Sequence, residues 1–191
     1  TEHILANQCL NHTVEEYKNG LLYDTERDAS LVERLRRIML RTVWAITEQM
    51  KLGKFDTVDS EVSFRMDKEK QTYIGRVDRI DTMETEENIY VKIVDYKTGK
   101  KDLSLSDLYY GLQLQLMVYL RAAVDKQTRR SKKMVIPAGV LYYHIEDPFV
   151  TSRLDFEEKR TYLLNELLMR GLVNEEDPVL PSLDATLAGE E

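Results

Sequence analysis

The chain has 191 residues, of which 42% are hydrophobic and 32% are charged, and its formal net charge is −7. This composition predicts one domain with a hydrophobic core. The negative charge argues against nucleic-acid binding through bulk charge, although it leaves room for a local basic path. No apolar run approaches the roughly 20 residues that span a bilayer, so we expect no membrane partner. The single cysteine, Cys9, excludes an internal disulfide and is consistent with a reducing, cytoplasmic setting.

Two helical segments are predicted at the start of the chain. Apolar residues recur at roughly helical spacing over residues 1–23, and a stronger period of three to four residues runs from Leu31 to Met50. Gly53 follows as a typical helix end. Because the chain begins at Thr1 without an initiator methionine, we expect it to be a piece of a longer protein.

Three strands are predicted next. Residues 61–66 alternate apolar and polar side chains, residues 72–81 form a second run, and residues 89–99 form a third. Short polar turns separate them, which is typical of an antiparallel meander.

A helix, a strand and a final helix complete the prediction. The pattern indicates a helix over residues 106–126 and a last helix over residues 155–170. Between them, residues 138–145 are apolar on both faces, which favours an interior strand, with Pro137 tolerated at its start. The basic run at residues 129–133 is read either as a solvated loop or as a patch that contacts phosphates.

This order predicts an α/β fold in which helices flank a mixed central sheet. We expect an N-terminal helical segment at residues 1–57, an α/β core at residues 58–170, and a loose acidic tail at residues 171–191.

The third strand carries charges on its apolar face. Side chains alternate faces along a strand, so Asp95 and Lys97 share a side with Ile93 and the aliphatic residues before it. Unpaired charges on such a face are costly, which suggests that the chain uses them.

Asp78 lies in a similar semi-buried setting on the preceding strand. If the two strands are neighbours, Asp78 and Asp95 come within a few Å, and one carboxylate would be protonated unless a cation lay between them. Mg²⁺ or Mn²⁺ prefers such oxygen ligands. Lys97 would then help deprotonate a metal-bound water or stabilise charge on a phosphoryl oxygen. The pattern indicates metal-assisted phosphodiester hydrolysis, and the alternative is a structural ion pair of Lys97 with Asp95 or Asp78.

Gln115 and Tyr119 lie four residues apart on one face of the predicted helix. A Gln in an apolar row could hydrogen-bond a phosphate or a carboxylate of the site. The alternative is a satisfied core amide beside a half-buried tyrosine.

Three motifs follow one another in the order of a known family. They are Gly75-Arg76-Val77-Asp78, Asp95-Tyr96-Lys97-Thr98-Gly99, and Gln115 with Tyr119. They resemble the G-x-(I/V)-D, D-Y-K-(S/T)-G and Q-x-x-x-Y motifs of PD-(D/E)xK nucleases of the RecB type. Residues 137–148 and 171–173 extend the resemblance to the nuclease domains of AddB-type subunits of AddAB helicase–nucleases, over roughly residues 58–185.

The resemblance implies a restriction-endonuclease-like α/β core and a nuclease core at residues 58–170. It implies that Asp78 and Asp95 bind the metal, that Lys97 is the catalytic lysine, and that Gln115 and Tyr119 form an auxiliary motif near the DNA. It also implies an Mg²⁺- or Mn²⁺-dependent exonuclease that acts on single-stranded DNA ends in recombination, with an AddA-type helicase subunit as partner.

Two departures from the family stand out. Members often carry a further metal ligand on an N-terminal helix, but His3 and His12 lack the motif expected around it, and Glu61 is better explained by a structural role. AddB-type domains commonly hold a four-iron four-sulfur cluster through four cysteines. With Cys9 alone, this chain is not expected to hold that cluster, although a longer parent could.

A second function remains open, namely a nuclease-fold module that no longer cuts and serves as a DNA-binding or subunit-docking surface. A lysine-based nucleotidyltransferase is disfavoured because Asp95 precedes Lys97, whereas the usual K-x-D-G signature has the opposite order. A phosphate-binding loop of the P-loop form is also missing from the sequence.

Overall fold

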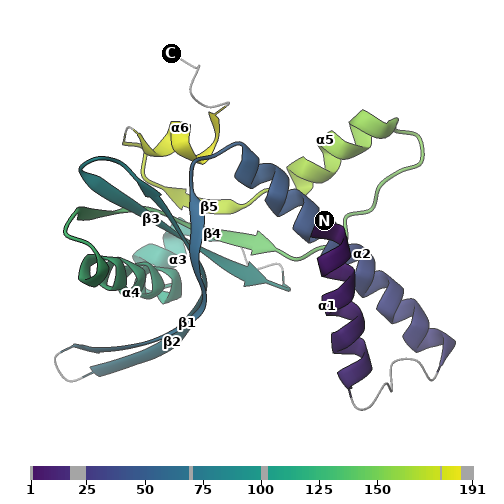
Figure 1. Ribbon diagram of the computed structural model, residues 1–191, viewed down its shortest axis with the longest axis horizontal. Helices are drawn as coiled ribbons and strands as arrows, with labels where there is room; N and C mark the ends of the chain where they lie inside the picture. Colours follow the sequence, from purple (N-terminus) through teal and green to yellow (C-terminus); the bar gives the residue numbers. More distant parts are fainter. Residues whose placement is uncertain (1, 18–24, 69–70, 100–102, 177, 186–191) are drawn as a thin grey trace. The chain divides into compact units, whose positions relative to one another are not determined.

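The computed structural model describes residues 2–17, 25–68, 71–99, 103–176 and 178–185 (Figure 1). The chain divides into two units, the first formed by residues 1–48 and 145–168 and the second by residues 49–144 and 169–191. Among the described residues, none of the helices is both long enough and apolar enough to cross a membrane.

The first unit is helical. It contains α1 (Glu2–Glu16), most of α2 (Glu26–Lys51) and α5 (Phe156–Glu166). Leu10 and Val14 of α1 pack against Val32 of α2. Arg36 of α2 also donates hydrogen bonds to two asparagine side chains of α1, so the two helices are joined by apolar and polar contacts.

Asp147 is the main ionic contact of the first unit. Its carboxylate accepts hydrogen bonds from Arg37 and Arg41 of α2, and Arg34 lies 4.0 Å away. The hydrogen bond from Arg37 lowers the pKa of the Asp147 carboxyl below its ordinary value, and the charges of the neighbouring arginines add to the effect. Residues 145–148 are thereby held on one side of α2.

The second unit is built on a five-stranded mixed sheet in the order β1-β2-β3-β4-β5. Its strands are β1 (Asp56–Lys68), β2 (Gln71–Glu84), β3 (Asn88–Lys97), β4 (Met134–His144) and β5 (Arg170–Val173). The first three strands form the predicted antiparallel meander, β4 runs parallel to β3, and β5 returns antiparallel to β4. The mixed sheet with flanking helices confirms the predicted fold class.

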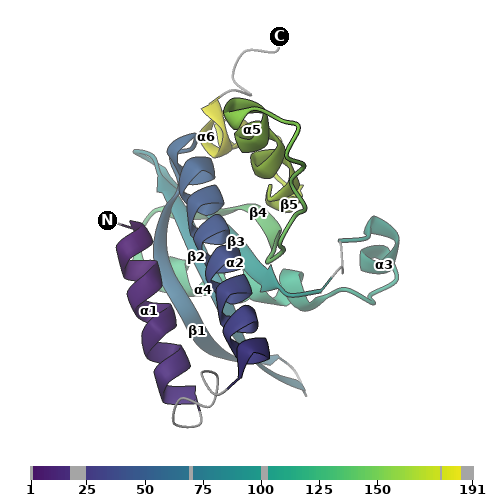
Figure 2. The same cartoon turned by 90° about the vertical axis from the view of Figure 1, so that its right-hand side faces the viewer.

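The predicted helix over residues 106–126 is wrong in its boundaries. The structure has a short helix, α3 (Leu105–Tyr109), and then α4 (Gln115–Arg130). Gly111 has a positive φ of 75°, which breaks the chain direction between them and leaves Leu112 71% exposed. Figure 2 shows α3 set apart from the sheet. Because α4 extends to Arg130, the basic run begins within its last turn and is only partly a loop.

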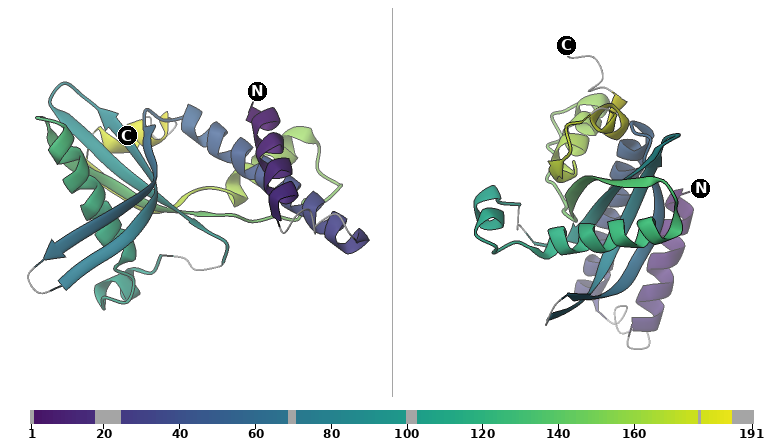
Figure 3. Two further views of the ribbon diagram at one scale, coloured as in Figure 1. Left: turned by 60° about the horizontal axis from the view of Figure 1, so that its bottom comes forward. Right: turned by 90° about the vertical axis from the view of Figure 1, so that its left-hand side faces the viewer.

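Helix α4 connects β3 to the parallel strand β4 and covers one face of the sheet (Figure 3). The core between them is formed by aliphatic residues of β2, β3 and β4 with Leu116 and Ala123 of α4. A second cluster on the sheet is formed by Phe55, Met83, Tyr90, Ala138 and Val179, the last of these on α6 (Val179–Leu183). The sheet is therefore stabilised by two separate apolar clusters.

A buried ionic cluster lies on β2 and β3. The fully buried Asp81 carboxylate accepts two hydrogen bonds from Arg79, at 2.7 and 2.8 Å, and one from the Thr57 hydroxyl. The Lys92 ammonium lies 3.5 Å from Asp81 and 4.8 Å from the centre of the Phe55 ring. Two buried cations thus depend on one carboxylate.

Two features of the last strands were not predicted. Strand β4 begins at Met134, so Pro137 lies inside it, at a register shift between Val91 and Lys92 of β3, where a missing N–H is tolerated. Strand β5 follows α5 over residues 170–173, where the sequence pattern indicated no strand. Its close approach requires Gly171, since a Cβ there would lie 2.0 Å from the Val140 carbonyl oxygen.

Candidate active site

The end of β3 carries a close ion pair. Lys97 Nζ lies 2.5 Å from Asp95 Oδ2. Asp95 is only 3% exposed, whereas the Lys97 side chain is 24% exposed. The predicted shared face is therefore real: the carboxylate is buried at the end of the aliphatic row, and the ammonium above it reaches solvent.

Asp78 lies beside this pair on the neighbouring strand. Arg79 pairs with Val94, so the antiparallel register brings Asp78 to the level of Asp95. The Tyr96 backbone N–H donates a hydrogen bond of 2.9 Å to Asp78 Oδ2. One oxygen of Asp78 is thus fixed by the strand that carries Asp95 and Lys97.

The electrostatics of the three side chains are coupled. Burial raises the pKa of the Asp95 carboxyl above its ordinary value, the contact with Lys97 opposes this rise, and the charge of Asp78 adds to it. Burial by itself would lower the pKa of Lys97, but the hydrogen bond and charge of Asp95 raise it above its ordinary value. Lys97 is therefore a protonated ammonium at neutral pH, and Asp95 is a carboxylate in an environment that disfavours its charge.

Tyr142 of β4 supports the lysine from below. Its ring centre lies 5.3 Å from Lys97 Nζ, and its backbone pairs with Asp95. Burial raises the pKa of the Tyr142 hydroxyl, so this phenol stays neutral. The interior position of β4 was predicted, but the register that places Tyr142 here was not, because a sequence does not specify which residues of two distant strands face each other.

Gln115 and Tyr119 begin α4. The Gln115 amide donates a hydrogen bond of 2.7 Å to the Tyr119 hydroxyl. Gln115 is exposed, so it is not the buried core amide of the alternative interpretation. Tyr119 packs edge-to-face on Phe64 of β1, and a Cβ at Gly75 would lie 2.8 Å from Phe64 and 3.1 Å from Tyr119. The glycine of the first motif therefore makes room for the tyrosine of the third.

The structure joins some of the predicted residues directly and others indirectly. Asp78, Asp95 and Lys97 meet at one end of β2 and β3. Gln115 and Tyr119 bond each other, and within the described residues no hydrogen bond links them to the two acids. The exposed Gln115 amide thus remains accessible to a ligand.

The donor set fits a hard divalent cation. Two carboxylates from adjacent strands supply oxygen atoms, and the raised pKa of Asp95 shows that its charge lacks full compensation. Among the residues that the structure describes, no group of three His, Cys, Asp or Glu side chains could enclose a metal ion. Such a cation would take its remaining ligands from water and substrate, as Mg²⁺ commonly does.

The other sequence candidates lie elsewhere. Glu61 is exposed at a positive φ of 52° and pairs with Arg76 at 2.9 Å, which agrees with a structural role. His3, Cys9 and His12 are exposed on α1, and His12 lies 3.4 Å from Glu16.

Comparison with known proteins identifies the family of this fold and site. Residues 2–187 match the PD-(D/E)XK nuclease superfamily, and the chain belongs to it. The resemblance predicted from the three motifs is thereby confirmed.

Several curated proteins are similar to the chain over nearly all of its length. One is an ATP-dependent helicase/deoxyribonuclease subunit (AddB) from Lachnoclostridium phytofermentans, 39% identical over 188 residues, which are 98% of this chain and 16% of the relative. Others with the same name come from Ruminiclostridium cellulolyticum, at 36% identity over 96% of the chain and 17% of the relative, and from Alkaliphilus oremlandii, at 36% over 94% and 17%. The chain thus spans about a sixth of the length of these relatives.

Proposed function

We propose that the chain is the metal-dependent deoxyribonuclease domain of an AddB-like helicase–nuclease subunit. It would hydrolyse phosphodiester bonds at single-stranded DNA ends, as an exonuclease, during double-strand break repair and recombination in the cytoplasm. An AddA-type helicase subunit would be its partner in the longer parent, where cysteines outside this chain could hold an iron–sulfur cluster. The observation that carries the proposal is the meeting of Asp78, Asp95 and Lys97 at one end of the sheet.

Superfamily membership and the relatives support this choice. The matched superfamily is one of nucleases, and the similar proteins are named for deoxyribonuclease activity. In these relatives the matching part is only about a sixth of the polypeptide, which agrees with a domain of a larger protein.

The two acids would hold Mg²⁺ or Mn²⁺. Asp78 is oriented by the Tyr96 N–H, and Asp95 is held beside it by the pairing of β2 and β3. A bound divalent cation lowers the pKa of water and neutralises charge on a phosphoryl group.

Lys97 would act on the substrate side. Its ammonium is anchored by Asp95 and the Tyr142 ring, yet it remains partly exposed. It is therefore placed to stabilise negative charge that develops on a phosphoryl oxygen. The exposed Gln115 amide, oriented by Tyr119, would contact the DNA strand at the start of α4.

The test is cleavage of labelled single-stranded DNA by the purified 191-residue chain with Mg²⁺, with Mn²⁺ and with a chelator. Cleavage should require the metal. Lys97→Ala and Asp95→Asn should each lower the rate by about 100-fold to 1,000-fold, the usual effect of losing one group that stabilises transition-state charge.

Asp67→Asn is the matched control, because Asp67 is an exposed carboxylate on the β1–β2 hairpin that is not part of the site. It should cut like the wild-type chain. Cleavage that persists in both site variants would show that these residues are not the catalytic set. If the wild type shows neither cleavage nor Asp95-dependent Mn²⁺ binding by calorimetry, the alternative of a non-cutting DNA-binding or docking module is correct.

A further inference from the structure

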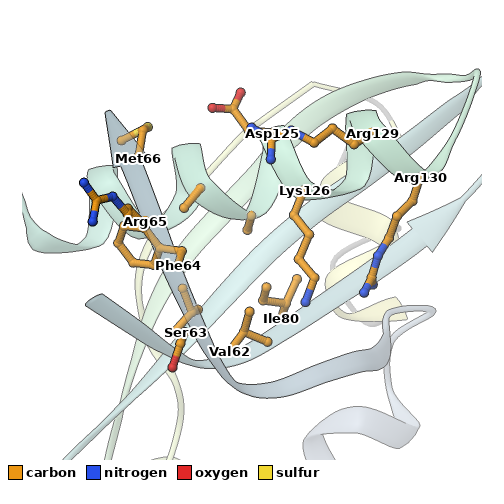
Figure 4. A pocket seen from close by; sticks show the side chains of 13 residues that line it. Val62, Ser63, Phe64, Arg65, Met66, Ile80, Asp125, Lys126, Arg129 and Arg130 are labelled. Atoms are coloured by element: carbon orange, nitrogen blue, oxygen red, sulfur yellow. The ribbon is translucent and has the colours of Figure 1, made fainter. Parts of the chain in front are cut away.

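A groove runs between β1 and the second half of α4 (Figure 4). It has a volume of about 380 Å³, within the range of small-molecule sites. Its floor is apolar and is formed by Val62, Phe64, Val77, Ile80 and Ala123. Contiguous apolar surface of this kind beside a nuclease site calls for an occupant.

The rim of the groove is cationic. Lys126, Arg129 and Arg130 of α4 and Arg65 of β1 line it, whereas Asp125 is the only acid among the lining residues that the structure describes. Figure 4 shows the Lys126 and Arg130 side chains reaching from the helix toward the strands, above Ile80. This concentration of positive charge contrasts with the net charge of −7 for the whole chain.

Two of these cations converge on a single carboxylate. Lys126 Nζ lies 3.0 Å from Asp59 Oδ1, and Arg130 donates a hydrogen bond of 2.8 Å to Asp59 Oδ2. The Asp59 side chain is 17% exposed, so the pair of cations is accessible at this point. A phosphate could replace the carboxylate between the same two cations.

The groove continues from the candidate active site. Val77 and Ile80 lie on either side of Asp78 in β2, and Phe64 contacts Tyr119. From Tyr119 to Arg130, α4 rises about 16 Å. The groove therefore leads along α4 from the auxiliary pair toward the basic end of the helix.

We propose that this groove binds a segment of single-stranded DNA, with its phosphates at Lys126, Arg129 and Arg130 and its bases against the apolar floor. Single-stranded nucleic acid is bound by surfaces that combine positive charge along the backbone with apolar or aromatic contact for the bases, and both are present here. The inference rests on the proposed nuclease function, because it assigns the groove to the strand that reaches Asp78 and Asp95. Asp59 then competes with the DNA phosphate for the two cations.

The competing carboxylate makes the test directional. Binding is measured by fluorescence anisotropy with labelled oligothymidylates of about 4 to about 16 nucleotides, using the full chain with Asp95→Asn so that the DNA is not cut. Adding Lys126→Ala or Arg130→Ala should weaken binding several-fold. Each should also lower the slope of log affinity against log salt concentration by about 0.7 for one lost phosphate contact.

Asp59→Asn should have the opposite effect. It removes the carboxylate that holds Lys126 and Arg130, so DNA affinity and salt dependence should both increase, a result that a purely structural ion pair does not produce. Lys132→Ala is the matched control, because Lys132 is an exposed lysine just past α4 that does not line the groove. It should bind like the parent chain. Lengthening the oligonucleotide should strengthen binding in the parent chain and less so in the groove variants.

The outcomes separate this inference from the proposed function. If the wild-type chain cuts DNA but Lys126→Ala, Arg130→Ala and Asp59→Asn leave DNA binding unchanged, the inference is wrong while the nuclease function stands, and the groove takes a different occupant such as an acidic peptide. If these variants change DNA binding as expected but the wild type does not cut with either metal, the groove assignment stands and the proposed catalysis fails. Tighter binding by Lys126→Ala would also overturn the inference.

Discussion

The buried ionic cluster on β2 and β3 allows a sharp prediction about stability. Asp81 is fully buried, and Arg79 and Lys92 beside it are 5% and 8% exposed. Asp81→Asn keeps the shape of the side chain but removes the one negative charge among two buried cations. Removing one partner of a buried ion pair costs about 3–5 kcal/mol. Because the Asn oxygen can still accept one hydrogen bond from Arg79 or Thr57, we expect a loss of about 3 kcal/mol of unfolding free energy.

Two further variants separate charge from burial. Asp67 accepts hydrogen bonds from Thr72 and Arg65, much as Asp81 does from Thr57 and Arg79, but the Asp67 side chain is 63% exposed. Asp67→Asn should therefore cost less than about 1 kcal/mol. Burial lowers the pKa of Lys92 despite the opposing charge of Asp81, so Lys92→Met should also cost less than about 1 kcal/mol, since an apolar side chain replaces a strained buried cation.

The assay is urea unfolding followed by circular dichroism, with thermal unfolding as a second measurement. For a chain of this size, about 3 kcal/mol corresponds to a fall of roughly 6–12 °C in Tm. The reasoning is refuted if Asp81→Asn is no more harmful than Asp67→Asn, or if Lys92→Met destabilises the chain as much as Asp81→Asn does.

Two other predictions concern Asp147 and Gly171. The pKa of Asp147 is below its ordinary value because Arg37 hydrogen-bonds it, so its contribution to stability is complete above the ordinary carboxyl pKa of about 4 and is lost as pH falls through the lower folded value. Asp147→Asn should therefore show a smaller loss of urea midpoint than wild type between about pH 5 and pH 2, and an equal loss in both would contradict this account. At Gly171, a Cβ would lie 2.0 Å from the Val140 carbonyl oxygen, so Gly171→Ala should cost about 1–3 kcal/mol and speed amide hydrogen exchange in β5. Gly99→Ala is its control, because a Cβ there meets nothing within 4 Å, and equal effects of the two substitutions would argue against close strand packing as the cause.

Much of the fold followed from local patterns. The period-two alternation along residues 89–97 placed Asp95 and Lys97 on one face, and the structure shows them 2.5 Å apart. The helical period from Leu31 to Met50 corresponds to α2. The order of the three motifs predicted the nuclease superfamily, which the comparisons confirm. The roles of Asp78, Asp95, Lys97, Gln115 and Tyr119 remain predictions.

Other features depended on residues far apart in the chain. The break at Gly111 escaped prediction because the apolar period of residues 106–126 continues through it, while Leu112 in fact faces solvent. Strand β5 has only four residues, and its position depends on pairing with Gly139 to Tyr142 of β4. Short strands of this kind carry little pattern of their own.

The sequence by itself determined the fold class, the faces on which the charged residues of β3 lie, and the family, because these depend on local periodicity and on motif order. The tertiary structure decided which distant residues meet. Strand register brought Asp78 to Asp95 and Tyr142 beneath Lys97. Packing of Phe64 against Tyr119 and the convergence of Lys126 and Arg130 on Asp59 then formed the groove beside the site. Contacts of this kind arise from the joint packing of several elements, and a single segment of sequence does not encode them.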